Sequence, residues 1–163
     1  MKKVLQWLDE NLEEVLLVIA LAAMAVIMGI QVIARYIFGA SLSWSEELTR
    51  YIFIWAGFLS VSYCTKKCIS IKIEQFVAMF PRRGKAIFKG VKHTFELILF
   101  LYLIPFAWKY LLSAIANGQT SPAMGIPMYY VQAAPLVGFI LTAIRVFQRW
   151  IIEWKRVFRK EGE

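Results

Sequence analysis

Residues that could hold a metal or a cofactor are scarce in this sequence. His93 is the only histidine, and Cys64 and Cys68 are the only cysteines. Two cysteines do not complete a zinc site, which has three or four protein ligands. A transmembrane haem needs axial ligands such as histidine or methionine, and a single histidine beside Lys92 does not meet that need. We therefore predict no enzyme and no catalytic, cofactor-binding or metal-binding residue. We expect a surface role for His93 and free cysteines at a helix end.

A second group of polar residues surrounds the predicted start of a helix near residue 44. Ser43 and Glu46 have the spacing of a capping box, and Glu46 and Glu47 would lie at the positive end of the helix dipole. Arg50 follows at a spacing that allows an intrahelical ion pair. The group forms either a capped, self-neutralised helix start or a polar anchor for a partner, and the two roles are compatible. The candidates for this motif and its partner contacts are Arg35, Ser43, Trp44, Glu46, Glu47 and Arg50.

The composition is that of a membrane protein. Of 163 residues, 60% are hydrophobic and 18% charged, with a mean hydropathy of +0.58, whereas soluble domains are about half apolar and a quarter charged. Uncharged stretches at 15–34, 51–65, 97–108 and 110–144, the last interrupted by turn residues, predict an all-α membrane protein with four transmembrane helices. The predicted segments of this single membrane domain are an interfacial helix at 1–14, transmembrane helices at 15–38, 44–65, 93–114 and 127–150, a basic cytoplasmic segment with an amphipathic helix at 66–92, a periplasmic connector at 115–126 and a cytoplasmic tail at 151–163.

The first apolar stretch has one competing interpretation, a cleaved signal peptide. Lys2 and Lys3 would suit its basic start. However, acidic residues that include Glu13 and Glu14 precede the apolar run, the run is long, and no small-residue cleavage site follows it. We therefore expect a retained membrane anchor.

Lysine and arginine set the predicted orientation. With four spans both termini lie on one side, which would carry 16 basic residues, while Arg35, Arg50 and Lys109 are the 3 on the other side, giving the total of 19. The positive-inside rule then places both termini in the cytoplasm. The net charge of +8 reflects this topology and contact with anionic lipid rather than nucleic-acid binding.

Two amphipathic segments flank these spans. One lies within residues 1–14, where leucines share one face and acidic residues, Glu13 and Glu14 among them, lie elsewhere. The other lies between Ile69 and Phe80. Each segment either lies flat at the cytoplasmic surface or packs on the helix bundle as a loop, and the sequence leaves both possibilities open.

The predicted spans offer little for ion-coupled transport. No carboxylate lies at mid-depth in any of them, and Glu96 lies near an end. A coupled carrier would need buried carboxylates or broken helices at the midplane, commonly in repeated halves, and the sequence has no convincing internal repeat. Pro105 and Pro135 predict bends. Small residues recur at four-residue spacing, which favours close helix packing, either within this chain or on another membrane protein. The helix-packing candidates are Ala56, Ser60, Ala134, Gly138 and Thr142.

Two motifs carry a resemblance to a known family. Arg35-Tyr36-x-Phe38, followed by Leu42-Ser43-Trp44-Ser45-Glu46-Glu47-x-x-Arg50-Tyr51, resembles the signature of the small membrane subunit of tripartite ATP-independent periplasmic (TRAP) transporters. Gln119-Thr120-Ser121-Pro122-Ala123 with Gly125-Ile126-Pro127, and then Ala134-Pro135, is similar to the connector before the last helix of that family. The sequence departs from the usual pattern at Ser60, where glycine is common, and at Lys67-Cys68-Ile69, where a histidine is frequent.

The resemblance implies a function that composition does not show. In this family a periplasmic substrate-binding protein captures a carboxylate solute, such as a C4-dicarboxylate, sialic acid or another sugar acid. A large multispan membrane subunit then moves the solute by a sodium-driven elevator motion. The small subunit braces the large one as a scaffold and has no transport site. The implied partners are thus the large subunit, the binding protein and membrane lipids. Three alternatives remain: a self-sufficient small homo-oligomeric carrier or channel, a membrane redox protein and an assembly factor.

Overall fold

The computed structural model describes residues 2–67 and 82–159. These residues form long helices and no β-strand, which confirms the all-α prediction. The long helices are α1 (Lys2–Ile37), α2 (Ser43–Lys67), α4 (Arg82–Asn117) and α6 (Ala134–Arg159), and a short helix α5 (Tyr129–Gln132) precedes the last of them.

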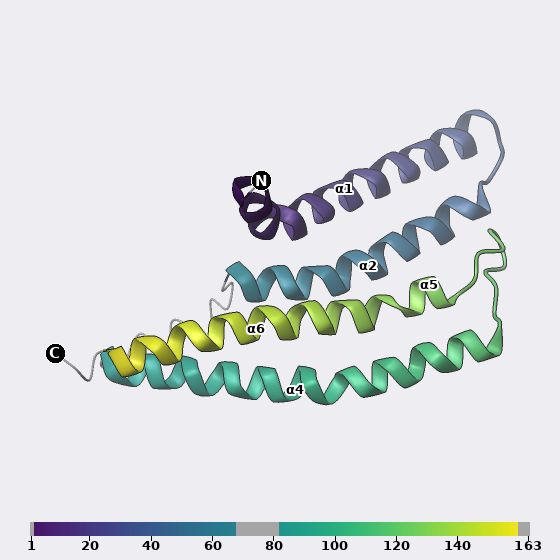
Figure 1. Ribbon diagram of the computed structural model, residues 1–163. Helices are drawn as coiled ribbons and strands as arrows, with labels where there is room; N and C mark the ends of the chain where they lie inside the picture. Colours follow the sequence, from purple (N-terminus) through teal and green to yellow (C-terminus); the bar gives the residue numbers. More distant parts are fainter. Residues whose placement is uncertain (1, 68–81, 160–163) are drawn as a thin grey trace.

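The four long helices stand side by side in a row (Figure 1). Helix α6 lies between α2 and α4, and α1 packs on the other side of α2. The helices at the ends of the row are consequently almost uncovered: 6% of the apolar window of α1 and 11% of that of α4 are buried, against 39% for the last helix. A single row buries few side chains, so the apolar surface that remains must be covered by lipid or by another membrane protein.

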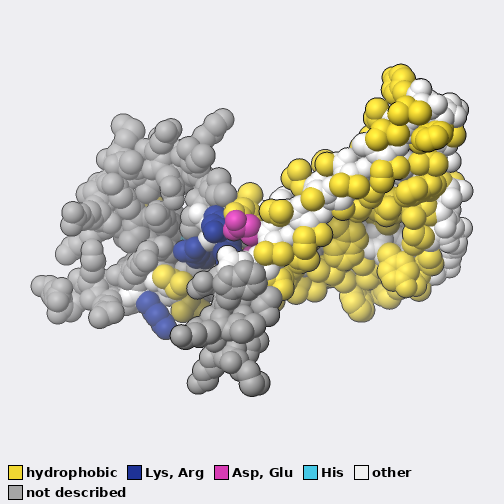
Figure 2. All heavy atoms as spheres, turned by 90° about the horizontal axis from the view of Figure 1, so that it is seen from above, with side chains coloured by type: hydrophobic (Ala, Val, Ile, Leu, Met, Phe, Trp, Pro, Cys, Tyr) yellow, Lys and Arg dark blue, Asp and Glu magenta, His cyan; other side chains and the backbone are white. Residues whose placement is uncertain are grey.

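Three segments are long and apolar enough to cross a membrane, namely Asn11–Ile37, Gly90–Asn117 and Tyr129–Ile152, since about 20 apolar residues span the hydrocarbon. The chain is therefore a multi-pass membrane protein. Helix α2 is less apolar because it carries charged residues in its first turn and at its end, Lys66 and Lys67. Figure 2, which views the molecule of Figure 1 from above, shows hydrophobic side chains over most of the described surface. The charged side chains in this view gather at one end of the described part.

The helix bounds differ from the predicted segment bounds at several points: α1 is one helix over both the predicted interfacial helix and the first span, and α6 extends to Arg159, into the predicted tail. Helix α4 begins at Arg82 and continues without a break through residue 93 and Pro105, and Figure 1 shows it gently bowed. The predicted helix at 127–150 is instead divided into α5 and α6 at Ala133. Proline has no N–H, so Pro135 cannot donate to the carbonyl of Val131, which explains the break. The predicted amphipathic helix between Ile69 and Phe80 lies outside the described residues.

Candidate functional site

The turn between α1 and α2 brings the C-terminal end of α1 and the N-terminal end of α2 together. Helix α1 ends at Ile37, and Gly39 follows with a φ of +64°, a left-handed conformation that glycine adopts without strain. The N–H of Ala40 donates to the carbonyl of Ala34 at 3.2 Å, which closes the helix end. Helix α2 then begins at Ser43 and runs back along α1.

The first turn of α2 is bonded to α1 through buried polar side chains. The Ser45 hydroxyl is fully buried and lies 2.5 Å from Gln31 Oε1 and 2.7 Å from the carbonyl of Leu42. Gln31 Nε2 donates to Glu46 Oε1 at 2.7 Å. The capping box predicted for Ser43 and Glu46 stays a prediction: Ser43 is the exposed first residue of α2, and the Glu46 carboxylate accepts from Gln31. Gln31 is the residue that the sequence analysis missed here.

Glu47 points the other way, into the protein. Its side chain is buried, at 8% exposure. Oε1 accepts a hydrogen bond from the Tyr51 hydroxyl at 2.5 Å, and Oε2 accepts one from the backbone N–H of Ala123 at 2.9 Å. The Tyr51 hydroxyl also lies 3.3 Å from Met128 Sδ. One carboxylate thus joins α2 to the connector between α4 and α5.

The connector is itself closed by backbone hydrogen bonds. Ser121 N–H donates to the carbonyl of Ile126 at 2.8 Å, and Met128 N–H donates to the carbonyl of Gln119 at 2.9 Å. The buried Ser121 hydroxyl accepts from the N–H of Met124 at 3.1 Å. The two sequence motifs, far apart along the chain, therefore meet at one site, which we call the Glu47 site (Glu47, Tyr51, Ser121, Ala123 and Met128).

The predicted ion pairs of the outer rim are not formed. The structure gives ion pairs within residues 11–67 and 88–155. None of these pairs joins Arg35 or Arg50 to Glu46 or Glu47. The reason is that Gln31, Tyr51 and the connector supply neutral donors to both carboxylates. The candidates of this motif that remain on the surface of the chain are Arg35, Ser43, Trp44, Glu46 and Arg50.

The small residues of α6 lie against α2. Ala134 and Thr142 are fully buried. A Cβ added at Gly138 would lie 2.7 Å from Phe58 Cβ and 3.1 Å from the Phe58 carbonyl oxygen, so only glycine fits there. The two candidates on α2, Ala56 and Ser60, are half-buried, and the Ser60 hydroxyl donates to the carbonyl of Gly57 at 2.7 Å.

A second polar cluster lies near the other ends of α1, α2 and α6. Glu13 is 1% exposed. Its Oε1 accepts from Arg145 Nε at 2.7 Å and from the Ser62 hydroxyl at 3.0 Å, while its Oε2 lies 3.2 Å from Lys66 Nζ. The prediction that Glu13 lies on the polar face of an interfacial helix is wrong. Ser62 and Lys66 of α2 and Arg145 of α6 enclose its carboxylate instead. We call these four residues the Glu13 cluster.

His93 is also buried, at 5% exposure, so the predicted surface role is wrong. Its Nδ1 lies 2.9 Å from Glu96 Oε2, and Lys92 Nζ lies 3.5 Å from the other oxygen of the same carboxylate. The cause is the continuation of α4 past residue 93, which packs this stretch on α6, where Trp150 Nε1 donates to the Thr94 hydroxyl at 2.9 Å.

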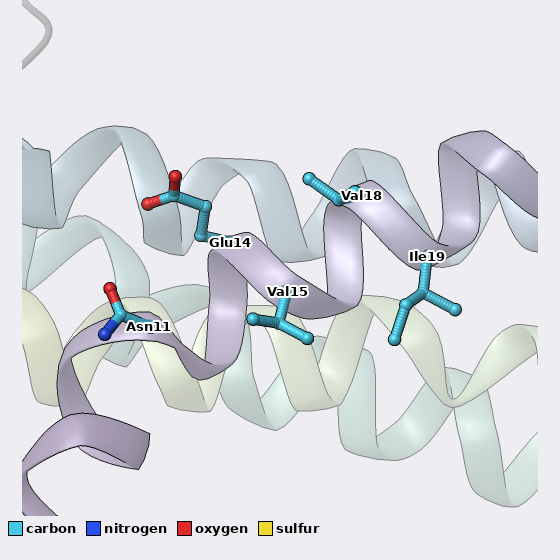
Figure 3. Close-up of a pocket in the computed structure, with 5 residues that line it drawn as sticks. All are labelled: Asn11, Glu14, Val15, Val18 and Ile19. Carbon is cyan, nitrogen blue, oxygen red and sulfur yellow. The ribbon is translucent and has the colours of Figure 1, made fainter.

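The part of the chain that the structure describes has no group of three or more His, Cys, Asp or Glu residues placed to hold a metal ion. Cys64 is free and exposed, and Cys68 lies outside the described residues. An open groove shown in Figure 3 is lined by five side chains that all come from α1, namely Asn11, Glu14, Val15, Val18 and Ile19. Solute sites are instead concave and have polar groups that converge from several elements, so this groove lacks that geometry.

Comparison with known proteins decides the family. Residues 24–156 match the DctQ component of the tripartite ATP-independent periplasmic transporters. The chain belongs to this family. As a TRAP small membrane subunit it is a non-enzymatic transport component of the bacterial inner membrane.

Curated relatives agree with this assignment. The chain is 32% identical over 155 residues to the isethionate TRAP transporter permease protein DctMQ of Oleidesulfovibrio alaskensis, an alignment that covers 89% of this chain and 24% of that protein. It is 28% identical to a putative TRAP transporter small permease protein of Haemophilus influenzae, with 91% of each chain covered. It is 25% identical to the ectoine TRAP transporter small permease protein TeaB of Halomonas elongata, with 85% of this chain and 72% of that one covered. This TRAP small subunit thus spans about a quarter of the isethionate permease and most of the two small permease proteins.

Proposed function

We propose that this TRAP small subunit is the scaffold of a sodium-coupled transporter. It braces a large elevator subunit, which takes up a carboxylate solute delivered by a periplasmic binding protein, and it carries no transport site of its own. The observation that carries the proposal is the single row of helices, in which the described polar side chains that form bonds between helices lie toward the helix ends. A row of this kind offers two broad apolar faces to a partner and to lipid, while a solute site would need converging polar groups.

We further propose four spans with both termini in the cytoplasm. Helix α2 lies between α1 and α6 in the row and is antiparallel to α1, so it crosses the same layer as its neighbours. The charges in its terminal turns then lie at head-group level. The count of 16 basic residues against 3 supports an orientation with the Glu13 cluster on the cytoplasmic side and the Glu47 site on the periplasmic side.

The solute we propose is a small organic anion with a carboxylate. The names of two relatives give ectoine and C4-dicarboxylate, which carry carboxylates, and a third gives isethionate, which is a sulfonate. A C4-dicarboxylate, sialic acid and other sugar acids are therefore the first solutes to test, and isethionate extends the set to a second acidic group.

The experiment is expression of the subunit with its large subunit and binding protein in a strain that lacks its own organic-acid carriers. We expect the large subunit to co-purify with the small one, and growth on one of these solutes to require all three genes. Growth that persists when the small-subunit gene is deleted would contradict the scaffold role. Growth with the small-subunit gene alone would favour the alternative, a self-sufficient homo-oligomeric carrier or channel.

A further inference from the structure

Helix α1 has one neighbour in the row, α2. It packs on α2 at the edge, and 6% of its apolar window is buried. In lipid, apolar packing has no hydrophobic drive, because lipid tails are as apolar as the side chains. Polar contacts between helices therefore contribute much of the free energy that holds α1 against its neighbour.

Such contacts occur at both ends of α1. At the outer end Gln31 bonds to Ser45 and Glu46, which belong to the adjacent helix α2. At the other end Glu13 bonds to Ser62 and Lys66 of α2 and also to Arg145 of α6. Helices α1 and α6 are not neighbours in the row, so Glu13 reaches past the helix on which α1 packs.

Glu13 and the next residue, Glu14, differ sharply in their surroundings. The Glu13 side chain is 2% exposed, and a buried carboxylate is stable only when it is paired and hydrogen-bonded. Glu14 forms an ion pair with Lys67 at 3.4 Å in which both side chains are 46% exposed, and exposed pairs of this kind contribute little. Glu14 is therefore a matched control for Glu13.

We infer that Glu13 is the positioning residue that fixes its end of α1 against α2 and α6. The cluster, rather than apolar packing, determines where α1 stands in the row, and so which surface the row offers to a partner. The consequence for transport rests on the proposed scaffold function, whereas the position of α1 does not.

The experiment measures distances between helices by double electron–electron resonance on the full chain, co-expressed with its large subunit and held in lipid nanodiscs. Cys64 and Cys68 are first replaced with serine. One pair of spin labels, at V18C and F147C, reports the distance between α1 and α6, and a second pair, at V61C and F147C, reports the distance between α2 and α6. These three label positions are exposed side chains.

We expect Glu13→Gln to broaden the α1–α6 distance distribution while the α2–α6 distribution stays narrow. Loss of one partner of a buried ion pair shifts the docking equilibrium of α1 by about a hundredfold or more. Glu14→Gln should leave both distributions narrow. The double exchange E13R/R145E keeps the net charge of the cluster but sets a guanidinium beside Lys66, so it should narrow the α1–α6 distribution in part relative to Glu13→Gln, which a purely steric role of Glu13 would not do.

Three results would overturn the inference: an α1–α6 distribution that stays narrow in Glu13→Gln, broadening of both distributions, or equal broadening in Glu14→Gln. Uptake measured in parallel separates this inference from the scaffold proposal. If uptake does not depend on the small subunit at all, the scaffold proposal fails, and the distances still decide the role of Glu13.

Discussion

Replacing Glu47 with alanine should destabilise the subunit far more than replacing its neighbour Glu46. In Glu47→Ala, the Tyr51 hydroxyl and the Ala123 N–H both lose their acceptor in a buried place. A hydrogen bond to a charged group contributes about 1.5–3 kcal/mol, so the two together amount to about 3–6 kcal/mol in the free energy of unfolding. Glu46 is exposed and accepts one hydrogen bond, from Gln31. Water competes for this bond, so loss of the Glu46 carboxylate costs about 1 kcal/mol in the free energy of unfolding.

The assay is thermal unfolding followed by tryptophan fluorescence, with the purified subunit in one detergent. At about 2–4 °C per kcal/mol for a chain of this length, Tm should fall by about 6–24 °C in Glu47→Ala and about 2–4 °C in Glu46→Ala. Tyr51→Phe removes one of the two donors and should give an intermediate fall. Equal losses in Glu46→Ala and Glu47→Ala would refute the reasoning, as would a Tm that hardly changes in Glu47→Ala.

Further predictions use the same unfolding assay. Gly138→Ala should lower Tm, because the added Cβ would lie 2.7 Å from Phe58 Cβ. The control is Gly57→Ala, where no atom lies within 4 Å of the added Cβ, and it should be neutral or stabilising by up to about 1 kcal/mol through helix propensity. Equal losses of Tm in the two variants would contradict the packing of α6 on α2. Gln31→Leu leaves Ser45 and Glu46 without their partner on α1 and should destabilise the subunit by about 2 kcal/mol, which lowers Tm by about 4–8 °C. Val32→Leu, on the exposed side of α1, is the control and should change Tm little. A Tm loss in Val32→Leu as large as in Gln31→Leu would argue against the contact of Gln31 with Ser45 and Glu46.

Hydropathy predicted the helical class because a long uncharged stretch in lipid has no water to bond its backbone N–H and C=O groups. A helix satisfies these groups within the stretch itself. The outer motif was also visible, since Glu46 and Glu47 stand at the start of a helix beside a turn. Their partners were not, because a local rule pairs residues three or four apart. Tyr51, four residues after Glu47, fits that rule, whereas Gln31 reaches Glu46 from α1 and Ala123 reaches Glu47 from the connector.

Glu13 and His93 show the same limit. Both were assigned to polar surfaces because charged and basic neighbours surround them in the sequence. In the structure, Glu13 faces donors from α2 and α6, and His93 lies on a helix that continues past the predicted span start. Burial of a polar residue depends on which helices are adjacent, and the order of helices in the row is set by tertiary packing that periodicity alone does not encode.

The most direct test of the scaffold account is solute uptake in liposomes with an inward sodium gradient and the binding protein outside. Four preparations are compared: the small subunit alone, the large subunit alone, both together, and both with Glu47→Ala in the small subunit. The account predicts uptake when both subunits are present, none with the small subunit alone, little with the large subunit alone, and a reduced rate with the variant. Uptake by the small subunit alone, or full uptake by the large subunit without it, would contradict the account.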